Sequence, residues 1–292
     1  VDVTPEMDRL AMKSQVFDEA WSSSSWTLPA HASLFTGLDD LAHGVNNEAF
    51  QVDPSQQTLA EHLSNQGYRC LGVYSGPFLK PMWGFARGFE RYESAMISPT
   101  ELEAEMLKWK QRANQAGHPE PTEKELALVK RHATLWDVSS ERLNKRGMRM
   151  LNEAAKSTEP FFLFLHYYDV HYDYLPERAD PILLSRFDPG YGGSMTGQDW
   201  HGNPDVRNTD PPYERKISRR DLQHVEALYD GEIYWVDFHI GQILAELRRL
   251  DLEKNTVVAI VSDHGDEFFD HGSLGHRTSL FPELTKMVFL LH

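Results

Sequence analysis

An aspartate and a histidine directly follow an apolar, β-branched segment of the chain. Residues 256–261 have the composition of a buried strand and lead into Asp263, His264 and Gly265. In open α/β sheets, ligands bind at the carboxyl ends of strands. A carboxylate and an imidazole at that edge favour a divalent metal ion. The simpler alternative is a solvated acidic loop. The other ligand-type side chains that follow are Asp266, Glu267, Asp270, His271 and His276.

A hydroxyl group precedes a predicted helix in a second segment. Pro29 is typical of a helix start and Gly37 of a helix end, so Thr27 is expected just ahead of the first turn. Backbone N–H groups at a helix N-terminus favour an anion. If a metal also binds it, the Thr27 alcohol can lose its proton and become a nucleophile, with His31 near the same anion. The residue types alone favour the alternative, in which Thr27 is a capping hydroxyl and His31 a surface residue.

A third group lies after the apolar segment 160–166, where His171 follows two tyrosines and an aspartate. A histidine at the carboxyl end of a strand can protonate a leaving group or hold a sulfuryl or phosphoryl oxygen. The alternative is a loop histidine stacked on the tyrosines, and the residues do not separate the two.

Predicted strands alternate with predicted helices around these segments. This alternation favours an α/β fold with a doubly wound, mostly parallel sheet flanked by helices. We interpret 1–292 as one catalytic domain that contains a charged helical insertion over 98–157 and a loop or lid over 176–217. The predicted elements are helices starting at Thr4–Pro5 and over 58–66 and 218–250, and strands over 69–75, 160–166 and 256–261.

Composition narrows the range of partners. The formal net charge of -15 makes nucleic acid and anionic membrane surfaces poor partners. An acidic enzyme can still bind an anionic substrate if a metal supplies local positive charge. A single cysteine, Cys70, rules out an internal disulfide. No apolar run approaches the roughly 20 residues that span a bilayer.

Together these segments resemble the sulfatase family of the alkaline phosphatase superfamily over nearly the whole chain. The resemblance depends on the order and spacing of many short pieces. They are Thr4-Pro5 with Asp8-Arg9-Leu10-Ala11, Thr27-x-Pro29-x-His31 ending in Thr36-Gly37, Gly67-Tyr68-Arg69, Gly88-Phe89-Glu90, Pro160-Phe161-Phe162 with Asp169-x-His171, Tyr229-Asp230-Gly231-Glu232 with Val236-Asp237, and Ser262-Asp263-His264-Gly265 with His271-Gly272 and Gly275-His276.

The resemblance implies a divalent metal ion (Ca²⁺, Mn²⁺, Mg²⁺ or Zn²⁺) held by Asp263, His264 and Thr27. Common sulfatases carry a Cys or Ser that becomes formylglycine, followed by x-Pro-x-Arg, whereas Thr27 and His31 stand at those positions here. Threonine cannot become formylglycine. The pattern is therefore closer to relatives with an unmodified threonine nucleophile, such as lipoteichoic acid synthases and phosphoethanolamine transferases. His31 and His276 would then neutralise the ester oxygens, while His171 assists the leaving group.

Two further positions depart from the family pattern. A Gly-Lys-x-His motif is usual after the strand ending at Ser75, and this chain has Gly76-Pro77-Phe78-Leu79-Lys80 instead. A lysine is usual near His276, so His276 is expected either to contact the anion or to act as an additional metal ligand.

The resemblance also implies that the sequence is incomplete at both ends. The family's first strand, which ends in acidic metal ligands, would precede Thr4-Pro5, and further strands would follow His292. Relatives of this kind are periplasmic, extracellular or membrane-anchored, and membrane association stays open because the termini are expected outside this sequence.

The predicted function is metal-dependent hydrolysis of a sulfate or phosphate ester of a small molecule or glycan. Two alternatives remain. One is transfer of a phospho-headgroup to an acceptor alcohol, and the other is a pseudoenzyme that binds a glycan or anion without turnover.

Overall fold

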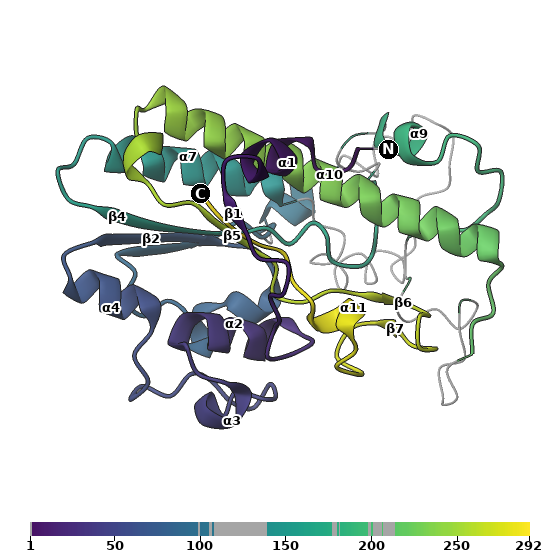
Figure 1. Ribbon diagram of the computed structural model, residues 1–292, viewed down its shortest axis with the longest axis horizontal. Helices are drawn as coiled ribbons and strands as arrows, with labels where there is room; N and C mark the ends of the chain where they lie inside the picture. The colour runs from purple at the N-terminus through teal and green to yellow at the C-terminus, as the bar shows by residue number, and fades with distance from the viewer. Residues whose placement is uncertain are drawn as a thin grey trace.

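A computed structural model of the chain describes residues 2–98, 100–104, 107, 139–176, 180, 182–197, 200, 206 and 214–292. Figure 1 shows strands in a central layer with helices on both sides. Helices α1 (Pro5–Ala11), α7 (Ser140–Ala154) and α10 (Arg219–Arg249) lie on one side. Helices α2 (Thr27–Thr36), α3 (Asp40–His43) and α4 (Leu59–Asn65) lie on the other. The predicted α/β class with helices on both faces is confirmed.

Three parallel strands form one part of the central layer. Strand β2 (Arg69–Tyr74) lies between β3 (Arg91–Ser94) and β4 (Phe161–His166), and both pairings are parallel. Arg69 is opposite Phe161, and Tyr74 is opposite His166. Because parallel strands end at the same edge, the segments after Tyr74 and His166 emerge side by side.

The other strands pair antiparallel, which the sequence did not predict. Strand β8 (Phe289–Leu291) lies between β1 (Gln15–Val16) and β5 (Ala259–Val261). The predicted strand over 256–261 is shorter than expected, since a 3₁₀ turn over Glu253–Asn255 precedes it. Strands β6 (Glu267–Phe268) and β7 (Leu274–Gly275) form a small hairpin, and the short helix α11 (Pro282–Thr285) leads into β8.

Helix boundaries follow the capping signals with one correction. Thr58 and Glu61 form a capping box at α4, and Ser218 accepts the Asp221 N–H at the start of α10, as the sequence indicates. Helix α2, however, begins at Thr27 and not at Pro29. Pro29 is its third residue, where the missing N–H would have had no partner within the helix. Gly37 ends α2 in the left-handed conformation, as predicted.

Apolar side chains fill both faces of the strand layer, as expected when helices cover a sheet on both sides. Below the sheet in Figure 1, Leu28 and Phe35 of α2 pack with Phe85 and Tyr74. Above it, two clusters join these helices to the strands. One includes Leu143 and Met150 of α7, and the other includes Leu151 of α7 with Leu244 and Leu247 of α10.

Two predicted segments are described only in part. In the charged segment 98–157, Ser98 and Glu101 form the predicted capping box, while the second capping box, over 122–125, lies outside the described residues. In the predicted loop 176–217, the described residues include helix α9 (Ile182–Phe187), so the loop prediction was wrong there. Burial of Leu183 explains this short helix. Within the described part of the chain, no helix has the length and apolarity to cross a membrane.

A buried carboxylate joins α1 to α10. Asp237 is 0% exposed and accepts the backbone N–H groups of Glu6 (2.9 Å) and Met7 (2.8 Å), the first turn of α1. Two N–H groups that a helix leaves without a partner are thereby satisfied. Asp237 belongs to the Val236-Asp237 piece of the family pattern, and its contacts give that piece a structural role.

We expect Asp237→Ala to lower the free energy of unfolding by about 2–4 kcal/mol, because two buried N–H donors lose their acceptor. Urea denaturation of the variant measures this. Gln223→Ala, an exposed position on the same helix, is the control and should change the free energy by no more than about 0.5 kcal/mol. An equal decrease in the free energy of unfolding of both variants would show that the contact of Asp237 with α1 does not stabilise the fold specifically.

Candidate active site

The predicted site residues from distant parts of the chain meet at one edge of the strand layer. Thr27 is the first residue of α2, and Asp263 and His264 come directly after β5. The Thr27 Oγ1 atom lies 3.2 Å from His264 Nε2, which lies 3.4 Å from Asp263 Oδ2. Neighbouring ligands of one cation, each about 2.1 Å from it, are about 3–3.4 Å apart. The three side chains therefore have the spacing of a shared metal shell.

The ring of His264 is fixed in one orientation. Its Nδ1–H donates to the carbonyl of Gly265 at 3.0 Å, so Nε2 carries the free lone pair and faces Thr27. Metal-binding histidines commonly donate the other ring N–H to a carbonyl or carboxylate. Gly265 is required for close packing, since a Cβ there would lie 2.1 Å from the Glu283 carbonyl oxygen. The backbone after β5 thus sets both the tautomer and the direction of His264.

His31 lies one helical turn beyond Thr27, and it is buried rather than on the surface. Its Nδ1–H donates to the Thr27 carbonyl at 2.9 Å, and Nδ1 lies 3.4 Å from Asp263 Oδ2. Burial lowers the pKa of His31, against the opposing effect of Asp263. His31 therefore presents a neutral imidazole whose Nε2 lone pair is not used by the contact with Thr27.

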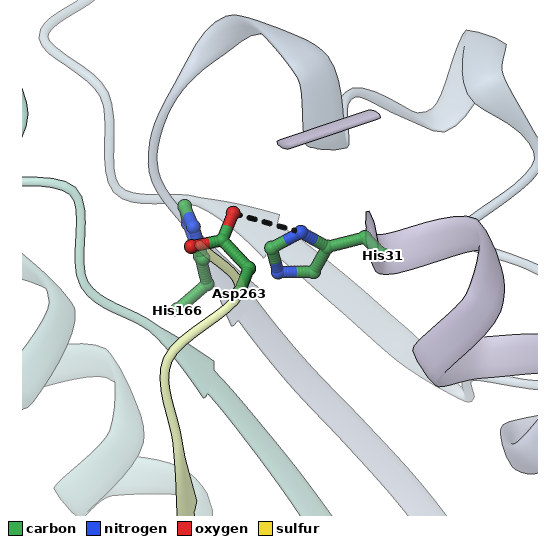
Figure 2. A group of neighbouring side chains, drawn as sticks. All are labelled: His31, His166 and Asp263. Atoms are coloured by element: carbon green, nitrogen blue, oxygen red, sulfur yellow. Dashed lines mark ion pairs between the residues drawn. The ribbon is translucent and has the colours of Figure 1, made fainter. Parts of the chain in front are cut away.

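The structure adds a residue that the sequence analysis did not select. His166 is the last residue of β4, and its ring centroid lies 5.0 Å from that of His31. Figure 2 shows the His31 ring facing the Asp263 carboxylate, with His166 drawn close to that carboxylate. One ligand atom from each of these three residues lies within 4.8 Å of the others, close enough to hold a metal ion. The sequence signal that could have identified His166 is its position at the end of a strand, where ligands bind in α/β sheets.

The histidines set the charge of Asp263. Burial alone would raise the pKa of this carboxyl group, but His264, His31 and His166 lower it, and the net pKa falls well below its usual value. Burial and the proximity of His31 lower the pKa of His166 to about 3. Around neutral pH Asp263 is thus a carboxylate beside the neutral imidazoles of His31 and His166, the protonation state that binds a cation.

A second cluster adjoins the first through His276, whose ring lies 4.4 Å from that of His264. The His276 Nδ1–H donates to Asp266 Oδ1 at 2.6 Å, and Tyr174 donates its hydroxyl to Asp266 Oδ2 at 2.7 Å. Burial would raise the pKa of Asp266, but the contact with His276 lowers it overall. A buried carboxylate therefore fixes His276 with Nε2 free, an arrangement the sequence did not reveal.

The structure places His171 against this second cluster, with its ring centroid 5.0 Å from that of His276. It also stacks on Tyr168 at 4.5 Å, as in the alternative of a loop histidine stacked on the tyrosines, while its catalytic role stays a prediction. Burial and the nearby His276 lower the pKa of His171 to about 3. His171 is therefore neutral at physiological pH, with its Nδ1–H donated to the Tyr172 carbonyl.

The start of α2 adds positive potential. Trp26 precedes the helix in extended conformation, and no side chain caps the first backbone N–H groups. Free N–H groups and the helix dipole favour an anion beside Thr27. The edge therefore brings together a hydroxyl, a carboxylate with neighbouring imidazoles and the N-terminal end of a helix.

The chain belongs to the sulfatase family, whose model matches residues 1–292. An arylsulfatase of Clostridium perfringens is 25% identical over 305 residues, covering 92% of this chain and 59% of the relative. Iduronate 2-sulfatase of Mus musculus is 24% identical over 323 residues, covering 99% of this chain and 55% of the relative. The chain thus spans a little over half the length of these relatives.

Solved structures show the same fold. A phosphonate monoester hydrolase of Agrobacterium radiobacter has a TM-score of 0.64 and 18% identity, covering 99% of this chain and 62% of that one. A protein solved with its substrate D-glucosamine-2-N,6-O-disulfate has a TM-score of 0.66 and 15% identity, with coverages of 99% and 66%. The fold of the chain is thus shared with a phosphonate monoester hydrolase and with a protein solved with a disulfated sugar as its substrate.

Proposed function

We propose that the protein to which this chain belongs hydrolyses a sulfate or phosphate ester, with Thr27 as nucleophile and a divalent cation at Asp263 and His264. The observation that carries this proposal is the 3.2 Å approach of Thr27 Oγ1 to His264 Nε2, beside the Asp263 carboxylate. Membership of the sulfatase family supports ester cleavage as the reaction class.

The side chains at this edge fit a divalent cation. A buried carboxylate with a lowered pKa and an imidazole with an oriented free nitrogen are suitable donors. When bound, the cation would lower the pKa of the Thr27 alcohol and polarise the ester. With a formal net charge of -15, the chain needs such local positive charge to hold an anionic substrate.

Thr27 would act as the nucleophile from the start of α2. Its hydroxyl lies on the first residue of that helix, whose N-terminal end favours an anion beside it. As Oγ1 bonds to sulfur or phosphorus, the bond to the leaving oxygen breaks. Water then attacks the substituted threonine and releases sulfate or phosphate. Thr27 is thus both the acceptor and the donor of the transferred group.

Two histidines, His276 and His171, would stabilise the negative charge that develops on the ester oxygens during transfer. His276, fixed by Asp266, would present Nε2 to an equatorial oxygen, and His171 would lie on the leaving-group side. His31 lies beneath Thr27 and secures the first turn of α2. These roles are part of the proposal, and substitution of each histidine tests them.

We propose sulfated or phosphorylated small molecules or glycans as substrates, since a structural neighbour is solved with a glucosamine disulfate. A panel of aryl sulfate, phosphate monoester, diester and phosphonate substrates tests the reaction class in the full-length protein. Hydrolysis of at least one ester, abolished by a chelator and restored by a cation, supports the proposal. Product formation only with an added acceptor alcohol would indicate a transferase, and binding without turnover would indicate a pseudoenzyme.

Asp266 is predicted to act as a positioning residue for His276. We expect Asp266→Asn to lower kcat by about 10–100-fold with little change in KM, because the amide loses the charge that holds the His276 Nδ1–H and can turn its own N–H₂ toward the ring instead. Asp266→Glu should restore part of kcat. Steady-state kinetics on the best ester measures both parameters.

Tyr174→Phe is the matched control, since it removes the other hydrogen bond to Asp266 and leaves the contact with His276 in place. It should lower kcat much less than Asp266→Asn does. Equal effects of the two substitutions, or a loss confined to KM, would contradict a positioning role.

A further inference from the structure

We propose that Arg277 binds a second oxyanion of the substrate, such as a carboxylate, and makes the site selective for esters that carry more than one negative charge. This inference rests on the proposed function, because it narrows the class of substrate that the Thr27 site would take. It goes beyond that function in assigning a binding role to a residue outside the clusters of histidines and aspartates.

Arg277 adjoins the candidate site through its own segment and through the start of α2. It directly follows His276 of the second cluster. Its backbone N–H donates to the Ser25 carbonyl at 3.1 Å, and its guanidinium carbon lies 4.0 Å from the ring centroid of Trp26. Trp26 immediately precedes Thr27, and consecutive Cα atoms are only about 3.8 Å apart. With 41% of its side chain exposed, Arg277 therefore lies at the rim of the site.

The backbone of Arg277 has an uncommon conformation. Its φ is 78°, in the left-handed region, where a residue with a Cβ is strained. Gly275 has a similar φ of 73° without that cost, because it has no Cβ. An arginine at a position that glycine would occupy without strain points to a role for the side chain.

The guanidinium of Arg277 is held in place and still has donors to offer. It lies over the Trp26 ring and 5.6 Å from the Phe78 centroid, so two aromatic rings support it. Among the contacts of the described residues, its side chain donates one hydrogen bond, to Glu48 Oε1 at 3.0 Å. A guanidinium has five N–H donors, and its planar fork matches the oxygens of a carboxylate. Donors therefore remain for an anion of the substrate.

The charge of Arg277 is important because the protein as a whole repels anions. The formal net charge is -15, whereas an arginine stays positive at any physiological pH. In the ion pairs and cation–π contacts of the described residues, Arg277 is the only arginine or lysine that contacts a neighbour of Thr27 in the chain. Glu48, which is 55% exposed, would compete with a substrate carboxylate for the same guanidinium. Substitution of Arg277 and of Glu48 should thus change the selectivity in opposite directions.

Two aryl esters that differ only in a carboxylate or a neutral carboxamide on the ring test this inference in the full-length protein. We expect kcat/KM to be about tenfold higher for the carboxylate ester, and Arg277→Gln to remove most of that preference. Glu48→Gln removes the competing carboxylate and should increase the preference. Arg248→Gln is the matched control and should leave it unchanged, because Arg248 also pairs with a glutamate, Glu253, at 3.3 Å.

Equal kcat/KM values of the unsubstituted protein for the two esters would overturn the inference. So would a carboxylate preference that persists in Arg277→Gln, with circular dichroism showing that the variant is folded. Isothermal titration of the same two compounds separates the inference from the proposed function, because it measures the preference without turnover. If neither ester were hydrolysed, the proposed reaction would be wrong, while a binding preference lost in Arg277→Gln would still support the anion site.

Discussion

Replacement of Thr27 by alanine is expected to lower kcat/KM for ester hydrolysis by about 10³-fold or more, because it removes the atom proposed to bond to sulfur or phosphorus. Thr27→Ser keeps a hydroxyl on the first residue of α2 and should retain part of the activity. The loss in the alanine variant should fall on kcat, since the helix end and the cation site that bind the anion remain. Steady-state kinetics of the full-length protein on its best ester measures these effects.

The control for this substitution lies on the same helix. Thr36 donates its hydroxyl to the Ala32 carbonyl at 2.6 Å, close to the other end of α2. Thr36→Ala removes a hydroxyl of the same kind without touching the site, so kcat/KM should stay within about twofold of the original. Turnover by Thr27→Ala near the original rate would exclude Thr27 as nucleophile, and a similar loss in Thr36→Ala would attribute the effect to α2 as a whole.

The second large effect is expected from Asp263→Asn, which keeps the size of the side chain and removes its charge. Asp263 is the only residue that contacts both His31 and His264 among the ion pairs of the described residues, each at 3.4 Å. Its loss should weaken cation binding by about 100-fold or more and reduce turnover correspondingly at limiting metal. Isothermal titration with Zn²⁺, paired with activity at rising metal concentration, measures both quantities.

Asp251→Asn provides the comparison for Asp263→Asn. Asp251 is exposed and has a φ of 57°, a left-handed conformation that asparagine also tolerates. Metal affinity and turnover should both be unchanged there. If Asp263→Asn bound the cation as tightly as the original protein, the site would have to lie elsewhere and the proposed role of this edge would be wrong.

Local signals in the sequence were sufficient for much of the fold. Capping residues Thr58 and Ser218 and the apolar period after residue 218 predicted α4 and α10 to within a residue. The strand before Asp263 and the run ending at His166 were also recognisable, because buried strands are short and apolar. These features depend on neighbours in the chain, so they can be predicted without coordinates.

Features that depend on distant contacts were not predictable in this way. The antiparallel pairing of β8 with β1 and β5 joins the two ends of the chain, and nothing near residue 289 specifies its partners. Helix α9 forms where Leu183 is buried by tertiary contacts. Residue types alone also favoured a surface position for His31, although the family resemblance put it near the anion, and the turn of α2 directs it beneath Thr27 toward Asp263.

Part of the candidate site could also be predicted from the sequence. Asp263 and His264 were selected from their position at a strand end and Thr27 from the family resemblance, and the structure brings the three together. His166 and Asp266 were not assigned roles, because only the fold shows that β4 ends beside α2 and that the hairpin β6–β7 returns His276 to Asp266. Their functional roles remain predictions.

The most direct test of the central proposal is a crystal structure of the full-length protein with Zn²⁺ and orthovanadate, a mimic of the transferring group. The proposal predicts vanadium bonded to Thr27 Oγ1, with the cation between that group and the Asp263 carboxylate. A cation bound away from Asp263 and His264, or vanadate bound while the Thr27 hydroxyl points elsewhere, would contradict it.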